Sequence, residues 1–262
     1  MCRLLGSVSR TPVTVDEVLG ERRDDFFGLA RKHGDGWGHA WSSGTELQVR
    51  KDPGSALTSP ELAALAADQP ALAAVTHLRW ATLSLAVGMD NTHPFTDGPP
   101  SSTSGTIAFA HNGSVKPPAV LDALVAPELA AERRGTTDSE RYFLALRSRM
   151  REEEPGTALI RTVEAVVAGG AVVNSLNALL LTPTHLYAVC SYDPGSDEDP
   201  DYYPLLYRSS ADRVVVTSTG WTDSTGWSTL GNGQLLVVDR RTLQTSVVPV
   251  ATPVPVDEAV AG

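Results

Sequence analysis

The sequence lacks several features that would place it in other classes of protein. It contains only two cysteines, Cys2 and Cys190, and no apolar run of the length that crosses a bilayer. The first residues also lack the apolar segment of a secretory signal. We therefore expect a cytoplasmic protein with no membrane partner, in which the two thiols are free and have different roles.

Basic residues are also scarce. The chain has 21 Lys and Arg against 31 Asp and Glu, which gives a formal net charge of -10, and the basic residues form no stripe. Such a chain repels a phosphate backbone, so we expect no nucleic-acid partner. The six histidines do not combine with cysteines or carboxylates into a metal-ligand spacing. No P-loop is present either, and we expect neither a metal nor a cofactor.

Short apolar runs and helical periods alternate irregularly along the chain, which predicts a mixed α and β protein. Strands often follow one another without an intervening helix, so we do not expect an alternating parallel design. We expect one domain over residues 1–250 and a mobile tail over 251–262. The predicted strands are Leu4–Val8, Ala73–His77, Thr106–Ala110, Ala178–Thr182, His185–Val189, Arg213–Thr217 and Gln234–Val238. The predicted helices are Pro60–Ala67, Pro118–Val125, Asp138–Met150 and Thr157–Val167.

Cys2 is the residue best placed in the sequence to act as a nucleophile. An initiator methionine is commonly removed when a small residue follows it, and removal of Met1 would leave a thiol and an α-amino group on one residue. An α-amine titrates near pH ~8, so it can act as the base for its own side chain. The alternative is that Cys2 is an ordinary small residue at the start of a strand. The polar motifs further along the chain favour the nucleophile.

A predicted strand runs directly into Asn112 and Gly113. The asparagine side-chain amide and the glycine backbone N–H can both donate to one oxyanion, and glycine lets the backbone come close. The alternative is an ordinary Asn-Gly turn. Because no complementary strand follows at once, we favour the oxyanion hole.

Three further residues are candidates for binding an amino-acid head group. Arg79 can form a planar fork onto a carboxylate, and His93 could donate to the same group. Asp138, in the first turn of a predicted helix, could accept from a substrate ammonium. Each has a structural alternative: an internal ion pair, a packed histidine and a carboxylate stabilised by the helix dipole, respectively.

A glycine-rich aromatic run covers residues 32–41. Its glycines would let a strand pass close to another backbone, and we expect that backbone to be the one carrying Cys2.

Taken together, six motifs resemble those of the class II glutamine amidotransferases, and especially their stand-alone glutaminase-like branch. They are Met1-Cys2-Arg3, His33-Gly34-Asp35-Gly36-Trp37-Gly38, His77-Leu78-Arg79-Trp80-Ala81-Thr82, Asn91-Thr92-His93-Pro94-Phe95, His111-Asn112-Gly113 and Thr137-Asp138-Ser139-Glu140. The resemblance implies an α+β fold, the four-layer αββα N-terminal nucleophile sandwich with two mostly antiparallel sheets. It also implies roles: Cys2 as nucleophile and Asn112 with Gly113 as oxyanion hole. Arg79, with Trp80 and Thr82, would bind the substrate carboxylate, together with His93, and Asp138 would bind the ammonium.

The resemblance implies an amidohydrolase that cleaves a γ-glutamyl amide bond through a Cys2 thioester and releases glutamate. The substrate is then a γ-glutamyl conjugate, as in the γ-glutamyl hydrolase of ergothioneine assembly, or glutamine, with the ammonia passed to a separate synthetase. We favour the first, because we expect no acceptor domain in this chain. A third hypothesis is a non-catalytic relative that binds amino acids or a partner protein. The sequence predicts neither the leaving amine nor the oligomeric state.

Overall fold

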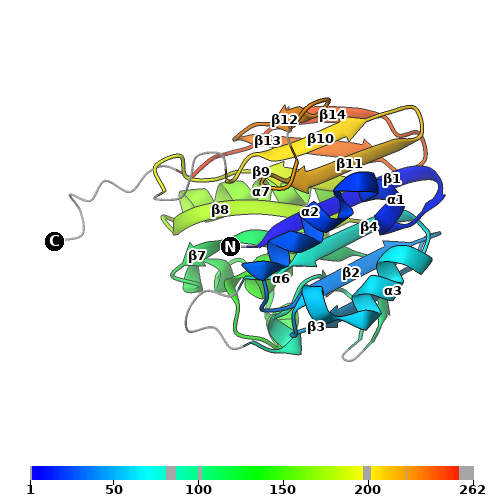
Figure 1. Cartoon of the computed structure of the whole chain (residues 1–262). Coiled ribbons are helices and arrows are strands. Elements are labelled where there is room, and N and C mark those ends of the chain that lie inside the picture. Colours follow the sequence, from blue (N-terminus) through cyan, green and yellow to red (C-terminus); the bar gives the residue numbers. More distant parts are fainter. Residues whose placement is uncertain (1, 81–86, 100–101, 197–201, 223, 254–262) are drawn as a thin grey trace.

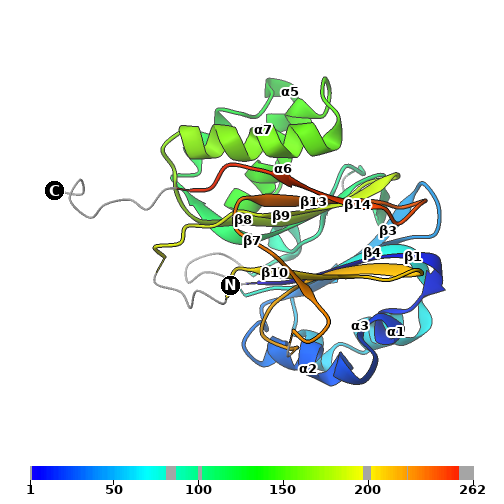
Figure 2. The same cartoon turned by 90° about the horizontal axis from the view of Figure 1, so that it is seen from above.

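Two antiparallel sheets are stacked face to face, with one layer of helices outside each sheet, in the computed structural model of the chain (Figure 1). Figure 2 shows the four layers edge-on, with α5, α6 and α7 on one side and α1, α2 and α3 on the other. The structure describes residues 2–80, 87–99, 102–196, 202–222 and 224–253. This αββα arrangement confirms the predicted fold class.

The first sheet has eight strands in the order β12-β10-β11-β1-β4-β2-β3-β6. Its central pair, β1 and β4, joins the start of the chain to the segment that ends just before Arg79. The strands are β1 (Arg3–Val13), β2 (Trp37–Ser42), β3 (Leu47–Asp52), β4 (Ala71–Leu78), β6 (Ser104–Gly105), β10 (Leu205–Ser209), β11 (Arg213–Ser218) and β12 (Ser228–Leu230).

The second sheet has six strands in the order β14-β13-β9-β8-β7-β5. The short strand β5 pairs with β7 only at Phe109 and Ala108, so among the described residues the rest of that edge of β7 has no neighbouring strand. The strands are β5 (Phe95–Thr96), β7 (Ala108–Lys116), β8 (Val172–Leu181), β9 (His185–Cys190), β13 (Gln234–Asp239) and β14 (Thr245–Pro249).

The helices cover the outer faces of the two sheets. Those on the first sheet are α1 (Val15–Leu19), α2 (Arg23–Gly28) and α3 (Pro60–Asp68), and those on the second are α4 (Ala119–Asp122), α5 (Pro127–Ala130), α6 (Asp138–Arg149) and α7 (Pro155–Ala168). Short 3-10 turns lie at Gly20–Arg22, Leu29–Arg31, Ala56–Thr58 and Met89–Asn91. None of the helices in the described part of the chain is both long and apolar enough to span a membrane.

Side-chain alternation along the strands builds three apolar layers. Successive residues of a strand point to opposite faces, so Leu4 packs between the sheets while Leu5 packs under α1–α3. On β7, Ala108 and Ala110 face the first sheet, whereas Phe109 faces α6 and α7. This alternation fixes which strand residues can reach the space between the sheets.

All seven predicted strands are present, but β1 (Arg3–Val13) and β8 (Val172–Leu181) extend well beyond the predicted Leu4–Val8 and Ala178–Thr182. Three of the four predicted helices are present with small differences in length. The strand predicted at Thr106–Ala110 instead begins at Ala108 and continues to Lys116, and the helix predicted at Pro118–Val125 is α-helical only over Ala119–Asp122. The predicted mobile tail lies outside the described residues from position 254 onward.

Candidate active site

The candidate active site lies between the two sheets, where β1 begins and β4 ends. Cys2 continues the inter-sheet face of β1 that carries Leu4, because side chains alternate along a strand. The antiparallel register pairs Arg3 with Leu78, so Cys2 and Arg79 are opposite one another one step beyond. The positive charge of Arg79 accordingly acts on the Cys2 thiol. The predicted nucleophile and the predicted carboxylate-binding residue are thus neighbours.

The Cys2 thiol is held in its protonated form at neutral pH. Burial raises its pKa above the ordinary value, and the backbone of Trp80 and the charges of Arg79 and Arg3 oppose this only in part. Its Sγ lies 3.8 Å from the carbonyl oxygen of Trp80, to which the thiol donates. A nucleophile in this environment needs a nearby base to remove its proton.

Arg79 is anchored to the loop that precedes β2. Its backbone N–H donates to the Gly36 oxygen (2.8 Å), its carbonyl accepts from the Asp35 N–H (3.1 Å), and its Nη1 donates to the Asp35 oxygen (3.1 Å). Arg79 is buried, and burial lowers the pKa of its guanidinium, while the neighbouring Cys2 and Asp35 raise it. These bonds fix the base of the side chain.

Trp80 lies beside the site with a cation on its ring. The Nζ of Lys32 is 4.8 Å from the centre of the indole, and the ring of His33 meets it edge-on at 5.4 Å. Thr82, predicted to line the same pocket, lies outside the described residues.

Asn112 is a fully buried residue whose side-chain amide has no hydrogen-bond partner among the described residues. Its register partner on β8, Asn177, shows the contrast. Asn177 Nδ2 donates to Tyr203 (2.6 Å) and its Oδ1 accepts from the Ser191 N–H (2.8 Å). Leaving a buried polar group without a partner costs about 1–3 kcal/mol. The Asn112 amide can therefore hydrogen-bond to a polar group between the sheets at no cost to an internal bond.

Gly113 allows two strands to come closer than any other residue would. A Cβ added there would lie 1.8 Å from the carbonyl oxygen of Ser175 on β8. The neighbouring Ser114 N–H points to the β8 side, where Asn174 Oδ1 accepts it at 2.7 Å. Because backbone N–H groups alternate along a strand, the Gly113 N–H points to the open edge of β7. The interpretation as an Asn-Gly turn is wrong, since both residues lie inside a strand.

Asp138 joins helix α6 to the same open edge of β7. Its Oδ2 accepts from the Val115 N–H at 2.6 Å and its Oδ1 from the Ser139 N–H at 2.9 Å. Val115 lies two residues beyond Gly113, about 7 Å along a strand. Asp138 is thus positioned by backbone bonds near the predicted oxyanion hole.

His111 is a positioning residue that the sequence analysis named only as part of a motif. Its Nε2 lies 3.1 Å from the Ser175 oxygen and its Nδ1 2.9 Å from Ser139 Oγ. A carbonyl oxygen can only accept, so the proton is on Nε2 and the serine hydroxyl donates to Nδ1. One neutral ring therefore ties β7 to β8 and to the first turn of α6, and so fixes the strand of Asn112 relative to Asp138.

His77 and His93 form a buried pair behind the site. Their ring centres are 4.3 Å apart, and His93 also packs against Phe95 at 4.7 Å. Burial, with the charge of Arg79 adding to it, lowers the pKa of His77 to about 3, and that of His93 well below its ordinary value. Both rings are neutral at physiological pH. The direct role of His93 toward a substrate carboxylate stays a prediction.

The glycine-rich run of residues 32–41 contains β2. We expected this run to lie against the strand of Cys2, and that prediction is wrong. Strand β4 separates β1 from β2. The close approach is instead at Gly38, where an added Cβ would lie 1.9 Å from the carbonyl oxygen of His93. This contact holds the His93 segment against the first sheet.

Neutral buried histidines make the fold sensitive to acid, which gives a first testable prediction. Burial lowers the pKa of His39 to about 4, whereas an unfolded histidine titrates near ~6.5. Between these values the unfolded chain binds a proton that the folded chain does not. As the pH is lowered through this range, the free energy of unfolding therefore falls by up to about 1.4 kcal/mol per pH unit for each such ring. Chemical denaturation at pH 7, 6 and 5 measures this slope.

His39→Gln is expected to make the free energy of unfolding depend less steeply on pH, because the variant takes up about one proton fewer on unfolding. The matched control is His185→Gln, because His185 is half-buried at the surface end of β9. An unchanged slope in His39→Gln would contradict the assignment.

No group of three or more His, Cys, Asp or Glu side chains in the described ranges is arranged to hold a metal ion. The structure makes the Cys2 thiol and the Arg79 guanidinium neighbours on the first sheet, and it places the Asn112 amide on β7 of the second sheet with the Asp138 carboxylate bonded to the same strand. Such a set can hold a zwitterionic head group by its two charges and present a carbonyl to the thiol.

Comparison with known proteins agrees with this architecture. A family model described as "Glutamine amidotransferases class-II" matches residues 1–196. A Haemophilus influenzae protein named "Putative glutamine amidotransferase" is 27% identical over 254 residues, which cover 89% of this chain and 82% of that protein. A glutamine aminotransferase class-II domain protein from Silicibacter pomeroyi has a similar structure, with a TM-score of 0.65 and 23% identity over 95% of this chain and 100% of that one.

The glutamine phosphoribosylpyrophosphate amidotransferase of B. subtilis, solved with ADP and GMP, shares the fold with a TM-score of 0.64 at 18% identity. The match covers 95% of this chain but 49% of that enzyme. The fold is therefore that of the N-terminal nucleophile amidotransferases. The chain belongs to the class II glutamine amidotransferase family.

Proposed function

We propose that this protein is an N-terminal cysteine amidohydrolase that cleaves the γ-glutamyl amide bond of a γ-glutamyl conjugate. The observation that carries the proposal is the buried Asn112 amide, which has no partner among the described residues and points from the second sheet into the space that Cys2 and Arg79 face from the first sheet. Family membership supports the reaction type, and the choice of a conjugate over glutamine is ours.

In the proposed reaction, removal of Met1 frees the α-amine of Cys2, which accepts the thiol proton. The thiolate attacks the δ-carbonyl carbon, an S–C bond forms, and the carbonyl electron pair moves onto oxygen. The Asn112 amide and the Gly113 N–H stabilise this oxyanion. When it collapses, the C–N bond breaks and the proton held by the α-amine passes to the leaving nitrogen.

The second half of the reaction restores the enzyme. Water, deprotonated by the α-amine, attacks the thioester carbon, and the same oxyanion hole stabilises the second tetrahedral intermediate. The C–S bond then breaks, the thiolate takes back a proton, and glutamate leaves. Arg79 and Asp138 hold the α-carboxylate and α-ammonium through both steps.

A paired assay separates the two enzymatic hypotheses. Glutamate release from a panel of γ-glutamyl amines is measured beside ammonia release from glutamine at equal concentration. We expect kcat/KM to be highest for a γ-glutamyl amine. A preference for glutamine would indicate a glutaminase that supplies ammonia to a separate synthetase, and no turnover of any γ-glutamyl compound would indicate a binding protein.

Arg79→Lys is expected to raise KM about 10–100-fold with a smaller change in kcat, because lysine keeps the charge but loses the planar fork. Steady-state kinetics on the best substrate measures both constants. The matched control is Arg208→Gln. Arg208 lies on strand β10, and its guanidinium packs over the ring of Trp227 at 4.9 Å rather than in the candidate site. An unchanged KM in Arg79→Lys would remove Arg79 from the substrate pocket.

A further inference from the structure

A cavity of about 610 Å³ lies at the edge of the sandwich, beside helix α6. Its walls come from β3, β5, the segment at Ser102 and Thr103, and the helix face that carries Glu140, Phe143 and Arg147. Small-molecule sites in proteins are typically ~300–1,000 Å³. The cavity is therefore large enough for an organic ligand.

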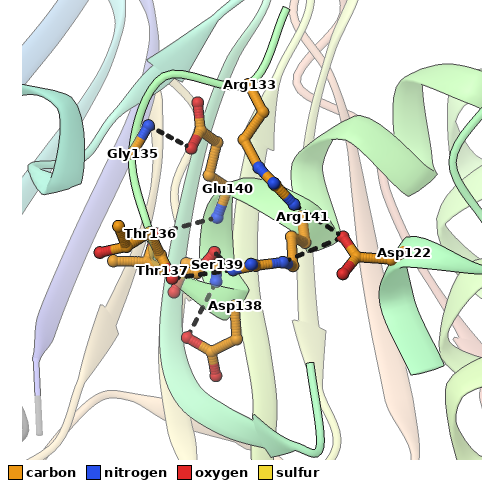
Figure 3. Close-up of polar contacts among 9 residues, drawn as sticks. All are labelled: Asp122, Arg133, Gly135, Thr136, Thr137, Asp138, Ser139, Glu140 and Arg141. Carbon is orange, nitrogen blue, oxygen red and sulfur yellow. Dashed lines mark hydrogen bonds and ion pairs between the residues drawn. The ribbon is translucent and has the colours of Figure 1, made fainter. Parts of the chain in front are cut away.

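This cavity is separate from the candidate active site. Successive residues of an α-helix are about 100° apart around its axis, so Asp138 and Glu140 project from nearly opposite sides of α6. Figure 3 shows the two carboxylates pointing away from each other, with Glu140 directed toward Gly135 and Asp138 in the other direction. Asp138 bonds to β7, whereas Glu140 lines the cavity.

Lys51 places an ammonium group in the wall of the cavity. Its Nζ donates to the Thr92 oxygen at 2.8 Å, which uses one of its three N–H donors, and it lies 5.5 Å from the centre of the Phe95 ring. Burial lowers its pKa to about 8, with Asp90 and Glu140 opposing the shift. An anion bound in the cavity would offset the cost of burying this cation.

Arg134 brings a second cation to the same wall. The Glu140 carboxylate accepts from the backbone N–H groups of Arg134 (2.8 Å) and Gly135 (2.7 Å), which fixes the loop that carries the arginine. The guanidinium itself donates to the Gly98 oxygen at 3.4 Å, a long bond.

Two of the three carboxylates that line the cavity already have partners. Glu140 accepts the two backbone bonds of its loop, and Glu132 is paired with Arg147. The third, Asp90, is exposed on a short turn at the rim. Four basic residues line the cavity, Arg50, Lys51, Arg134 and Arg147, against these three carboxylates, so the formal charge of its lining is positive.

The rest of the wall is apolar. Phe95, Phe143 and Leu144 are buried residues that line it, and Met89 lies at its rim with 48% of its surface exposed. Burial of apolar ligand surface against such a wall is favourable. Arg50 and Arg147 are paired with Glu61 and Glu132, so the cavity combines the cations of Lys51 and Arg134 with an aromatic and aliphatic wall.

We propose that this cavity binds a small organic anion, with its carboxylate or phosphate on Lys51 and Arg134 and its aromatic or aliphatic body against Phe95 and Phe143. The site is distinct from the γ-glutamyl site, and the proposal does not depend on the proposed function.

Isothermal titration of the full chain with phenyl phosphate and with 3-phenylpropionate tests this proposal. At least one of them is expected to bind saturably at one site at pH 7, while phenol does not, and excess glutamate is expected not to displace it. Whichever anion binds more tightly identifies the head group. No saturable binding of either anion, or displacement by glutamate, would overturn the proposal.

Two variants locate the binding. Lys51→Met and Arg134→Gln are each expected to weaken binding at least about tenfold, and the exposed position of Arg134 lets that variant report even where Lys51→Met does not fold. Lys116→Met is the matched control, because Lys116 is exposed at the end of β7. Equal affinities in Arg134→Gln and Lys116→Met would also overturn the proposal.

Discussion

Replacement of Cys2 by alanine is expected to lower turnover of γ-glutamyl amides at least about a thousandfold, because the thioester can no longer form. Alanine is also small, so removal of Met1 is still expected, and the α-amine of residue 2 is retained. The loss then reports on the sulfur alone. Circular dichroism and denaturation of the variant, measured beside its kinetics, establish that the fold is intact.

Cys190→Ala is the control for this experiment. The Cys190 thiol lies fully buried in the core between the sheets, donates to the Tyr203 oxygen at 3.8 Å, and has its pKa raised by burial to about 12. It is therefore chemically inert near neutral pH. Activity is expected to be nearly unchanged, and loss of activity in Cys190→Ala alone would mean that the other thiol is the nucleophile.

Asn112→Asp is expected to lower kcat about 100–1,000-fold with a smaller effect on KM. The substitution keeps the shape of the side chain but replaces the donating NH₂ with a carboxylate oxygen. The developing oxyanion therefore loses a hydrogen bond that exists only during the reaction, and an ionised carboxylate also repels it. The Asn112 amide has no partner among the described residues, so the variant breaks no internal hydrogen bond of the folded protein.

Asn177→Asp provides the comparison on the adjacent strand. The Asn177 amide donates to Tyr203 at 2.6 Å, so loss of its donor is expected to lower the free energy of unfolding by about 1–3 kcal/mol. The folded fraction is expected to keep its kcat. Chemical denaturation and steady-state kinetics on both variants separate the two effects, and an unchanged kcat in Asn112→Asp would remove Asn112 from the reaction.

The sequence predicted seven strands because they are short apolar runs, but it missed β2, whose six residues are all buried inside the first sheet. Strands β4 and β8 are buried on both faces, and their composition alone distinguishes them from loops. Strand β14 is largely exposed at the sheet edge and β5 is only two residues long. Neither has a hydrophobic pattern strong enough to recognise.

The residues of the candidate site could be named from the sequence, but the contacts that position them could not be predicted. Cys2, Arg79, Asn112 and Asp138 were each named from a local motif. The contacts that position them join distant segments: Ser139 and Ser175 both bond to His111. Such contacts depend on how the sheets stack, which no local pattern encodes. The same limit explains why the neighbour of the glycine-rich run was predicted wrongly.

The most direct test of the account is mass spectrometry of the intact protein and its peptides after reaction with a γ-glutamyl electrophile. We predict a processed chain that begins at Cys2 and carries one γ-glutamyl group on that residue, with Cys190 unmodified. A chain that keeps Met1, or that carries the group on Cys190, would contradict the proposal that the first residue supplies both the nucleophile and its base.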